Sequence, residues 1–480
     1  MARDVALGVD SSTQSVKVVA LDVQTGEIVA EGRARHSGED IQDPRDWWTA
    51  LVEATRSCVS QDLNPLAISI GGQQHGCVTL DAEGAPVRPA PLWNNVDAAE
   101  DAERLNAEAD FAAAIGTRLV SSITIAKLAH LARTDPADLE RTAAVCLPHD
   151  YLTFRMTGNL VTDRGDASGN GWWSPGEFRD RRDLLSLAVG PDAAQRLRLP
   201  EVLGPDTVAG ALMPEAAREL GLPVGIAVGP GSGDNMAAAL GIGANAGEMV
   251  ISLGTSGTAF AISRFATHDE TGEVCGFADA TGHFLPLACM LNCTRVVDTI
   301  AAMLGIERVD ALDRALRLAP GANGLMMTPY FEGERTPNLP RASGEVFGLS
   351  SATSSPDLML RAALDAVAAG LAYCVEALNR LGIDAADVTL VGGGSQHPAW
   401  RQAIADATGK RVLVREAGEA AARGAALQAA AIALDAPVNQ VIARWRPPVV
   451  AAVDPRPAYR DAFRLDERRN LIDAMRVRYA

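Results

Sequence analysis

The sequence lacks the cysteine pattern of a disulfide framework or a zinc site. Its 480 residues include seven cysteines, an odd number, and no two of them form a CxxC pair. Extracellular disulfide scaffolds and structural zinc sites both depend on regularly spaced cysteines. We therefore expect reduced thiols, most of them buried as small apolar side chains. The seven are Cys58, Cys77, Cys146, Cys275, Cys289, Cys293 and Cys374.

Long hydrophobic runs and a leader segment are missing as well. Charged side chains interrupt every stretch of about 18 residues that a membrane helix would need. Arg3 and Asp4 interrupt the amino terminus too early for a signal peptide. These features predict a cytoplasmic protein with no membrane partner.

The chain also has no excess of positive charge. It contains 43 lysines and arginines against 60 aspartates and glutamates, which gives a formal net charge of −17. A broad surface for nucleic acid or anionic lipid needs the opposite balance. We expect no nucleic-acid partner, and any anionic ligand must be held by local groups.

The length of the chain exceeds one ordinary core and suits two domains of roughly 200–250 residues. A strand, a small polar turn and a second strand are predicted at residues 5–21 and again at residues 248–262. Strands and helices alternate in both halves, which favours a mixed α/β sheet in each. The sequence therefore predicts domains at residues 1–246 and 247–480, with a cleft between them.

Each half has one strand connection that is rich in small polar residues. Asp10 ends the first strand and precedes Thr13 and Lys17, while residues 254–257 of the second half read GTSG. A carboxylate at a strand end can hold hydrated Mg²⁺, and nearby backbone N–H groups can reach a phosphate. Either connection alone is more typical of an ordinary hairpin tip. The matching pair favours a grip on one polyphosphate from two sides.

A glycine-rich turn precedes an alanine-rich helix in the middle of the chain. Residues 229–235 read GPGSGDN. Glycine turns at helix starts can cradle a phosphate through backbone N–H groups, but the Asp234 carboxylate repels one. The turn also lacks the Lys and Ser/Thr of a Walker A loop. Asp234 can be the N-cap of the helix. Alternatively, it is a general base, and the glycines before it leave room for a substrate to come close.

Three further segments offer groups suited to ligands. Gln74 and His75 follow a buried strand and offer an amide and an imidazole to a polyhydroxylated ligand. Trp93 and Asn94 offer an apolar platform and a second amide, although Trp93 can equally be a packed core residue. Residues 392–395 read GGGS between a strand and a helix, where absent side chains leave room for a flat ring or a ribose. Without GxGxxG spacing they do not indicate a dinucleotide fold.

Two segments have a structural interpretation. Residues 163–173 read DRGDASGNGWW and are polar and rich in turn residues, so we expect them on the surface or in a cleft. Pro356 and Asp357 begin a helix whose apolar stripe continues to Gly382, which predicts a core helix.

In this order, the motifs together resemble the FGGY carbohydrate kinases, which belong to the sugar kinase/Hsp70/actin fold class. The resemblance spans nearly the whole chain. It implies two ribonuclease-H-like α/β domains that close on a sugar and MgATP. The matching stretches are GVD at 8–10, GQQHG at 72–76, LWN at 92–94, DRGDASG at 163–169, GSGDN at 231–235, LGTSG at 253–257, GERTP at 333–337 and GGG at 392–394.

The resemblance also implies roles for individual residues. Asp234 corresponds to the catalytic base, and Asp10 to the residue that holds Mg²⁺. The implied sugar-binding residues are Gln74, His75, Trp93, Asn94, Asp234 and Asn235. The implied nucleotide-binding residues are Thr13, Lys17, Gly254, Thr255, Gly393, Gly394 and Ser395.

The implied reaction transfers the γ-phosphoryl group of ATP to a sugar hydroxyl. The motifs are most like those of members that act on D-xylulose. Asn95 and Asn338 depart from the usual pattern, which leaves ribulose, gluconate, glycerol or another polyol as alternative acceptors. A different class is a non-enzymatic ATP-dependent clamp of the Hsp70/actin type, but the sequence offers no added β-rich peptide-binding domain. Dimers are common in the family, so a homodimer is one of the expectations.

Overall fold

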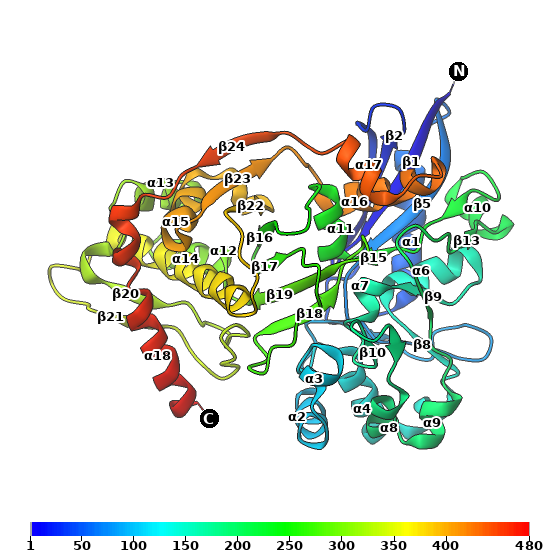
Figure 1. Ribbon diagram of the computed structural model, residues 1–480, viewed down its shortest axis with the longest axis horizontal. Helices are drawn as coiled ribbons and strands as arrows, with labels where there is room; N and C mark the ends of the chain where they lie inside the picture. The colour runs from blue at the N-terminus through cyan, green and yellow to red at the C-terminus, as the bar shows by residue number, and fades with distance from the viewer. Residues whose placement is uncertain (1, 480) are drawn as a thin grey trace.

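Two seven-stranded sheets organise the chain, one in each half of the sequence (Figure 1). The computed structural model describes residues 2–479. The strand order is β13-β14-β5-β1-β2-β3 in the first sheet, with β15 beside β5, and β18-β19-β17-β16-β22-β23-β24 in the second. The prediction of a mixed α/β sheet in each half is confirmed.

The first sheet begins with the two strands predicted at residues 5–21, and a third strand extends them into an antiparallel meander. β1 (Arg3–Ser11), β2 (Ser15–Asp22) and β3 (Ile28–Arg35) pair antiparallel in sequence order. β5 (Leu63–Gly72) then pairs with β1 in parallel, and β15 (Ser232–Gly233) pairs with β5 in parallel. Parallel strands end at the same edge of a sheet, so the residues that follow β1, β5 and β15 lie close together.

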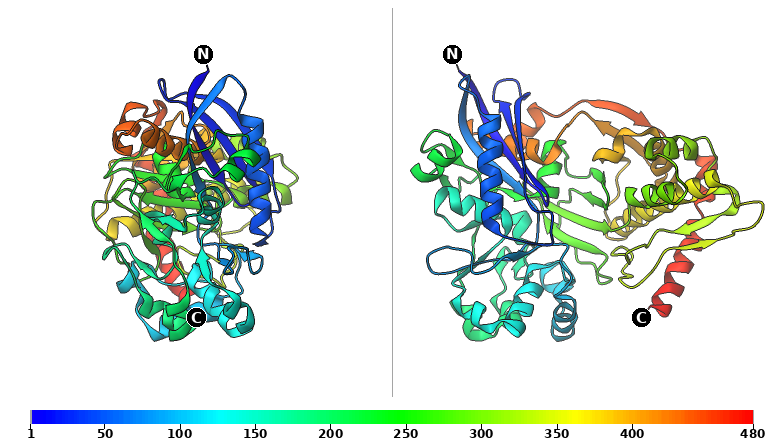
Figure 2. Two further views of the ribbon diagram at one scale, coloured as in Figure 1. Left: turned by 90° about the vertical axis from the view of Figure 1, so that its right-hand side faces the viewer. Right: turned by 180° about the vertical axis from the view of Figure 1, so that it is seen from behind.

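Both faces of the first sheet are covered by helices. Alternate residues of β1 pack on α1 (Pro44–Cys58) on one side and on α16 (Ala420–Ala433) on the other. The views from opposite sides show these two helices on opposite faces (Figures 1 and 2). A sheet that is buried on both faces requires strands without polar side chains on either face. The segment of β1 from Val5 to Val9 meets this requirement.

The remaining elements of the first half complete its sheet edge and form smaller helical layers. They are β4 (Ile41–Gln42), β6 (Val78–Leu80), β7 (Ala90–Pro91), α2 (Ala99–Glu108), α3 (Phe111–Ile115), α4 (Thr124–Thr134), α5 (Pro136–Arg141), β8 (Ala144–Cys146), α6 (Pro148–Thr157), β9 (Val161–Asp163), α7 (Arg164–Ala167), β10 (Trp173–Ser174), β11 (Arg179–Asp180), α8 (Arg182–Val189), α9 (Pro191–Arg196), β12 (Glu201–Leu203), β13 (Gly210–Ala211), α10 (Pro214–Leu220), β14 (Ala227–Val228) and α11 (Asp234–Gly241).

The second sheet repeats the plan of the first, as the sequence predicts. β16 (Met249–Leu253) and β17 (Gly257–Ala261) form an antiparallel hairpin, and β22 (Asp387–Val391) pairs with β16 in parallel. The other elements of this half are β18 (Val274–Ala278), β19 (Phe284–Met290), α12 (Thr294–Met303), α13 (Arg308–Leu316), η1 (Ala322–Gly324), β20 (Met326–Thr328), β21 (Glu345–Phe347), α14 (Pro356–Arg380), η2 (Gly393–Gln396), α15 (Pro398–Thr408), β23 (Arg411–Arg415), α17 (Val438–Arg444), β24 (Val449–Val453), η3 (Pro457–Phe463) and α18 (Leu465–Arg478).

The predicted core helix is α14, which begins at Pro356 and runs to Arg380. By length and composition it could cross a membrane, and α16 with α17 passes the same test as a bent pair. Inside the protein, 89% of the apolar window of α14 is buried. That degree of burial is the pattern of a core helix packed between other elements.

The prediction for residues 163–173 was wrong, because every one of them is buried. Short hydrogen bonds inside the segment replace water. The Asp163 carboxylate accepts from the N–H groups of Gly165 and Asp166, at 2.7 and 3.0 Å, and the Asn170 side chain accepts from those of Trp172 and Trp173. A polar turn can therefore lie in the interior when its donors are satisfied locally.

The helix α16 joins the two halves of the sequence. It follows β23 of the second sheet along the chain, yet it packs on β1, β5 and α11 of the first half (Figure 1). Glycines allow this close approach, because a β-carbon on Gly8 would lie 2.1 Å from the Ala422 carbonyl oxygen. A β-carbon on Gly424 would lie 1.8 Å from the Ala237 carbonyl oxygen of α11. The domain limits 1–246 and 247–480 stay a prediction.

We expect Gly424→Ala to destabilise the protein. The added methyl group collides with backbone atoms, which cannot rotate away as a side chain can, and overpacking of this kind costs about 1–3 kcal/mol. The apparent Tm in thermal unfolding should fall by several degrees. The control is Gly176→Ala, on an exposed loop where the new β-carbon would come no closer than 3.7 Å to its nearest neighbour. Equal Tm values for both variants would contradict the prediction.

Candidate active site

The carboxyl ends of β1, β5 and β15 bring three predicted site residues together. Asp10 of β1 is in register with Gly71 of β5, and Gly71 is in register with Ser232 of β15. Gln74 and Asp234 follow directly after β5 and β15. The first sheet therefore places the Asp10 and Asp234 carboxylates and the Gln74 amide at one edge.

Asp234 is the first residue of α11, and its carboxylate does not cap the helix. Gly233 holds the N-cap position, with no capping side chain. The Asp234 Oδ1 atom instead accepts hydrogen bonds from the backbone N–H and the side-chain Nδ2 of Asn235, at 2.7 and 2.9 Å. Burial and the nearby Asp10 carboxylate raise the pKa of Asp234 to about 7. Near neutral pH this group can exist in both protonation states.

The glycines before Asp234 pack against protein side chains. A β-carbon on Gly231 would lie 2.4 Å from His149 Cδ2, and one on Gly233 would lie 2.7 Å from Gln74 Cγ. Gly231 also has a φ of 82°, which favours glycine. The turn therefore needs glycine for its own packing, and the approach of a substrate over it stays a prediction.

Asn235 links Gln74 to the second sheet. Its Nδ2 donates to Gln74 Oε1 at 3.2 Å, and its Oδ1 accepts from Thr258 Oγ1 of β17 at 3.4 Å. The Gln74 Nε2 atom is buried and makes no hydrogen bond within 3.5 Å among residues 2–479, although the Gln74 side chain is near enough to Asp166 to oppose the rise of that carboxyl's pKa. A buried amide donor without a partner is costly, so it is well suited to a ligand oxygen.

His75 presents a neutral imidazole. Its Nδ1 lies 3.0 Å from the Gly169 carbonyl oxygen, which only accepts, so Nδ1 carries the proton. Burial, with the Lys127 and Arg335 cations, lowers the pKa of His75 to about 3. The Nε2 atom is therefore an acceptor, and the ring packs at 5.5 Å from that of Phe277 in β18. Sequence reasoning did not single out Phe277, Lys127 or Arg335 individually, because none of them lies next to His75 in the chain.

The tryptophan loop contacts the first polar hairpin. Trp93 Nε1 donates to Thr13 Oγ1 at 3.1 Å, while Asn94 is exposed. Asn95 is buried, and its amide donates to the carboxylates of Asp40 and Asp97, at 2.9 and 3.1 Å. An aspartate at position 95 would place a third carboxylate against these two, and the asparagine amide donates to them instead.

Asp10 is a buried carboxylate at the first hairpin. It is 8% exposed, and burial raises its pKa to about 6 although Lys17 opposes the shift. The Lys17 amine forms an ion pair with Glu419 at the start of α16. An ATP phosphate, the predicted partner of Lys17, would therefore compete with the Glu419 carboxylate for the Lys17 amine.

The chemistry of the donor set at Asp10 fits Mg²⁺. Within residues 2–479 no group of three or more His, Cys, Asp or Glu side chains could hold a metal ion. Mg²⁺ is commonly held by one or two carboxylates together with water and substrate phosphates, so a single buried Asp10 meets its needs.

The two predicted nucleotide loops lie side by side in the second lobe. A β-carbon on Gly394 would lie 2.9 Å from the Leu253 side chain that precedes Gly254. Gly393 is exposed and has no neighbour within 4 Å of the β-carbon position, whereas the Ser395 hydroxyl donates to the Gly392 carbonyl oxygen at 2.7 Å. Gly393 and Thr255 are therefore accessible to a ligand, whereas the Ser395 side chain stabilises the turn through its hydrogen bond to Gly392.

A buried ionic cluster packs against the end of β5 and the glycine turn that precedes Asp234. The His149 ring contacts the carboxylates of Asp166 at 2.7 Å, Asp150 at 3.2 Å and Asp163 at 3.8 Å. Burial disfavours protonation, but Asp150 and Asp166 outweigh it and raise the pKa of His149 to about 10. The sequence analysis did not single out residues 148–150, which read PHD, and it predicted a surface or cleft position for the DRGD stretch at 163–166.

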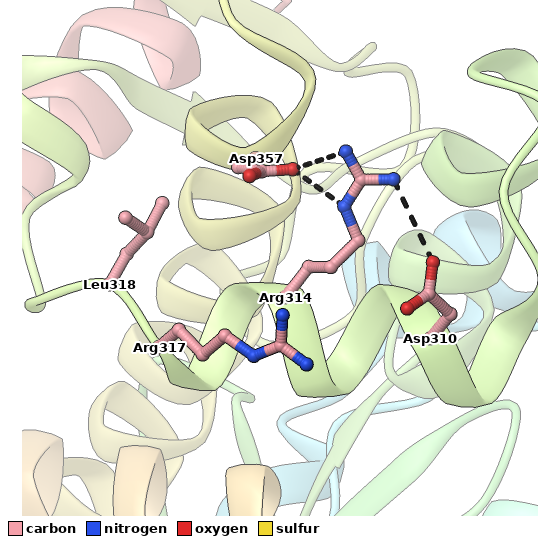
Figure 3. A pocket seen from close by; sticks show the side chains of 5 residues that line it. All are labelled: Asp310, Arg314, Arg317, Leu318 and Asp357. Atoms are coloured by element: carbon pink, nitrogen blue, oxygen red, sulfur yellow. Dashed lines mark hydrogen bonds and ion pairs between the residues drawn. The ribbon is translucent and has the colours of Figure 1, made fainter.

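A surface hollow of about 390 Å³ lies away from all of these residues, between α13 and α14. Figure 3 shows Arg314 reaching from α13 to Asp357 of α14 and to Asp310 of its own helix. None of the predicted site residues lines it. The candidate active site is therefore the edge of the first sheet and the loops that face it.

The chain matches two family models. Residues 5–241 match the N-terminal domain of the FGGY family of carbohydrate kinases, and residues 249–433 match its C-terminal domain. The chain is 45% identical over 459 residues to a xylulose kinase from Streptomyces rubiginosus, which covers 93% of this chain and 92% of the relative.

Solved structures resemble the fold over nearly its whole length. A xylulose kinase from Bifidobacterium adolescentis has a TM-score of 0.86 at 36% identity, covering 97% of this chain and 99% of its own. A gluconate kinase from Lactobacillus acidophilus has a TM-score of 0.90 at 21% identity, covering all of both chains, and shows the fold alone. The two matched models and the shared fold lead to one conclusion: the chain belongs to the FGGY family of carbohydrate kinases.

Proposed function

We propose that the protein transfers the γ-phosphoryl group of ATP to the 5-hydroxyl of D-xylulose, with Asp234 as general base. The observation that carries the mechanism is the Asp234 carboxylate, which has a pKa of about 7 and shares Asn235 as a hydrogen-bond partner with Gln74, whose Nε2 donor makes no hydrogen bond within residues 2–479. The choice of sugar is supported by the 45% identity to the xylulose kinase from Streptomyces rubiginosus.

Each residue at the sheet edge has one role in the proposal. The Asp234 carboxylate accepts the proton of the attacking hydroxyl, and Asn235 orients that carboxylate through its two hydrogen bonds. Gln74 Nε2 donates to a sugar oxygen, and His75 Nε2 accepts from a sugar hydroxyl. Trp93 and Asn94 cover the other side of the sugar with an apolar face and an amide.

The phosphates of ATP are held between the two polar hairpins. Mg²⁺ supplies charge neutralisation of the triphosphate when bound, and Asp10 is the residue that would hold it. Thr13 and Lys17 act from the first lobe, and Lys17 exchanges Glu419 for a phosphate oxygen. Gly254, Thr255, Gly393, Gly394 and Ser395 act from the second lobe. Positioning and electrostatics carry most of phosphoryl transfer, so these contacts account for much of the catalysis.

A substrate panel tests the function. ADP release is measured by a coupled assay with D-xylulose, D-ribulose, gluconate, glycerol and no acceptor. We expect D-xylulose to give the highest kcat/KM and the no-acceptor reaction to be far slower. A higher kcat/KM for another acceptor would show that this acceptor, and not D-xylulose, is the substrate. Slow ATP hydrolysis with no stimulation by any of them would favour the Hsp70/actin-like clamp.

We also propose a cytoplasmic location. All seven cysteines are free thiols, and all except Cys289 are buried, which suits a reducing compartment. Oligomeric state stays a prediction, and light scattering of the purified protein measures it.

Asp234→Asn should lower kcat by about 10²–10⁴, because the amide keeps the shape of the carboxylate but cannot accept a proton. Sugar affinity in a direct binding measurement should change much less. Asp192→Asn, on the exposed start of α9, is the control and should retain full activity. A kcat for Asp234→Asn close to that of the parent protein would disprove the role as base.

The rate should also depend on pH near neutrality. Asp234 acts as a base only when ionised, and its pKa is raised to about 7, so the active form is lost as pH falls through that value. We expect kcat/KM for D-xylulose to fall by about tenfold per pH unit on the acid side. In the metal-free protein, Asp10→Asn removes the like charge, so the pKa of Asp234 measured by NMR titration should fall. An unchanged pKa of Asp234 in that variant would contradict this electrostatic coupling.

A further inference from the structure

His75 has a backbone conformation that few side chains adopt. Its φ is 64°, in the left-handed region that glycine favours and that a β-carbon disfavours. Such a conformation persists only when surrounding contacts hold it, and it is often found at functional sites. The contacts that hold the His75 carbonyl group come from α4, a helix that supplies none of the predicted site residues.

Two side chains of α4 bind the His75 carbonyl oxygen. Thr124 Oγ1 donates to it at 3.1 Å, and Lys127 Nζ donates to it at 3.2 Å. The Lys127 amine also donates to the Ser122 carbonyl oxygen. Thr124 is fully buried and Lys127 is 3% exposed, so neither bond is made in competition with bulk water.

Lys127 is a buried cation that forms no ion pair within residues 2–479. Its amine contacts two backbone carbonyl oxygens, and burial lowers its pKa to about 7. Arg335, which donates to the Ser122 hydroxyl at 3.2 Å, is a second cation and adds no compensating negative charge. Burying an ammonium without a carboxylate is unfavourable. Both protonation states of the amine can donate, so the hydrogen bond to His75 does not depend on the charge.

The imidazole of His75 is fixed from the opposite side. Its Nδ1 donates to the Gly169 carbonyl oxygen, and a β-carbon on Gly169 would lie 2.4 Å from His75 Cε1. The carbonyl group and the ring are thus held separately, one by α4 and the other by the turn after α7. Together these contacts determine where Nε2 points.

We propose that Lys127 and Thr124 are positioning residues for sugar binding. By binding the His75 carbonyl oxygen they hold the left-handed conformation in which the neutral Nε2 faces the sugar. This inference rests on the proposed function, in which His75 contacts the sugar. The cost of burying the Lys127 ammonium is then offset by a preorganised binding group.

The first test compares two variants of α4. Lys127→Met keeps the length and the apolar stem but removes the donor, and Thr124→Val removes the hydroxyl but keeps the shape. We expect Lys127→Met to raise KM for D-xylulose about tenfold or more, and Thr124→Val to raise it severalfold. Kcat and the KM for ATP should change by less than about twofold.

Two matched substitutions serve as controls. Thr124→Ser keeps the hydroxyl and should restore the KM of the parent protein. Lys410→Met removes a lysine amine of the second lobe that pairs with Asp384, and should leave sugar binding unchanged. Thermal unfolding of each variant checks that it is folded, and Thr124→Val tests the inference if Lys127→Met does not fold.

A double-mutant cycle separates positioning from general structural support. In His75→Gly the ring is absent, and glycine adopts a φ of 64° without help, so adding Lys127→Met should raise KM little further. The same fold increase in both backgrounds would overturn the proposal. Unchanged sugar KM in Lys127→Met and Thr124→Val, with an increase in His75→Gly, would also overturn it. If His75→Gly itself leaves the KM of every sugar unchanged, the sugar contact in the proposed function is wrong and the inference falls with it.

Discussion

Parallel pairing of β5 with both β1 and β15 is the constraint on which the site depends. It brings three segments, separated by more than 200 residues of sequence from Asp10 to Asp234, to one edge of one sheet. The pairing needs helices on both faces of the sheet, and one of these, α16, comes from the far end of the chain. The glycine contacts of α16 therefore support the first sheet and connect it to the second half.

Burial of carboxylates is a cost of this arrangement. Burial raises the pKa of Asp234, Asp10 and Asp163 alike, and the His149 cation opposes this only for Asp163 and its neighbours Asp150 and Asp166. Such groups are expensive for stability and useful for chemistry, because a carboxylate that titrates near neutral pH is a better base than an exposed one. In the proposed complex, the substrate hydroxyl would be the partner of the Asp234 carboxylate, and Mg²⁺ with its bound phosphate would be the partner of Asp10.

Local patterns predicted much of the fold. The strand, turn and strand at residues 5–21, their repetition at residues 248–262 and the core helix from Pro356 all follow from apolar periodicity and turn residues, and the structure contains each of them. The buried segment 163–173 was not predicted correctly, since turn composition does not reveal whether local hydrogen bonds satisfy the backbone. Lys127 could not be connected with His75, because 52 residues separate the two ends of that hydrogen bond.

The sequence by itself determined the family and the identity of the candidate base, because ordered motifs and the presence of a carboxylate after a glycine turn are local properties. Only the tertiary structure decided the hydrogen bonds, ion pairs and pKa values of these groups. Asp234 is not an N-cap, His75 is neutral and held in a left-handed conformation, and Lys17 is paired with Glu419. Each of these facts arises from burial or from a contact between distant segments, and neither burial nor such contacts are encoded in any short stretch of residues.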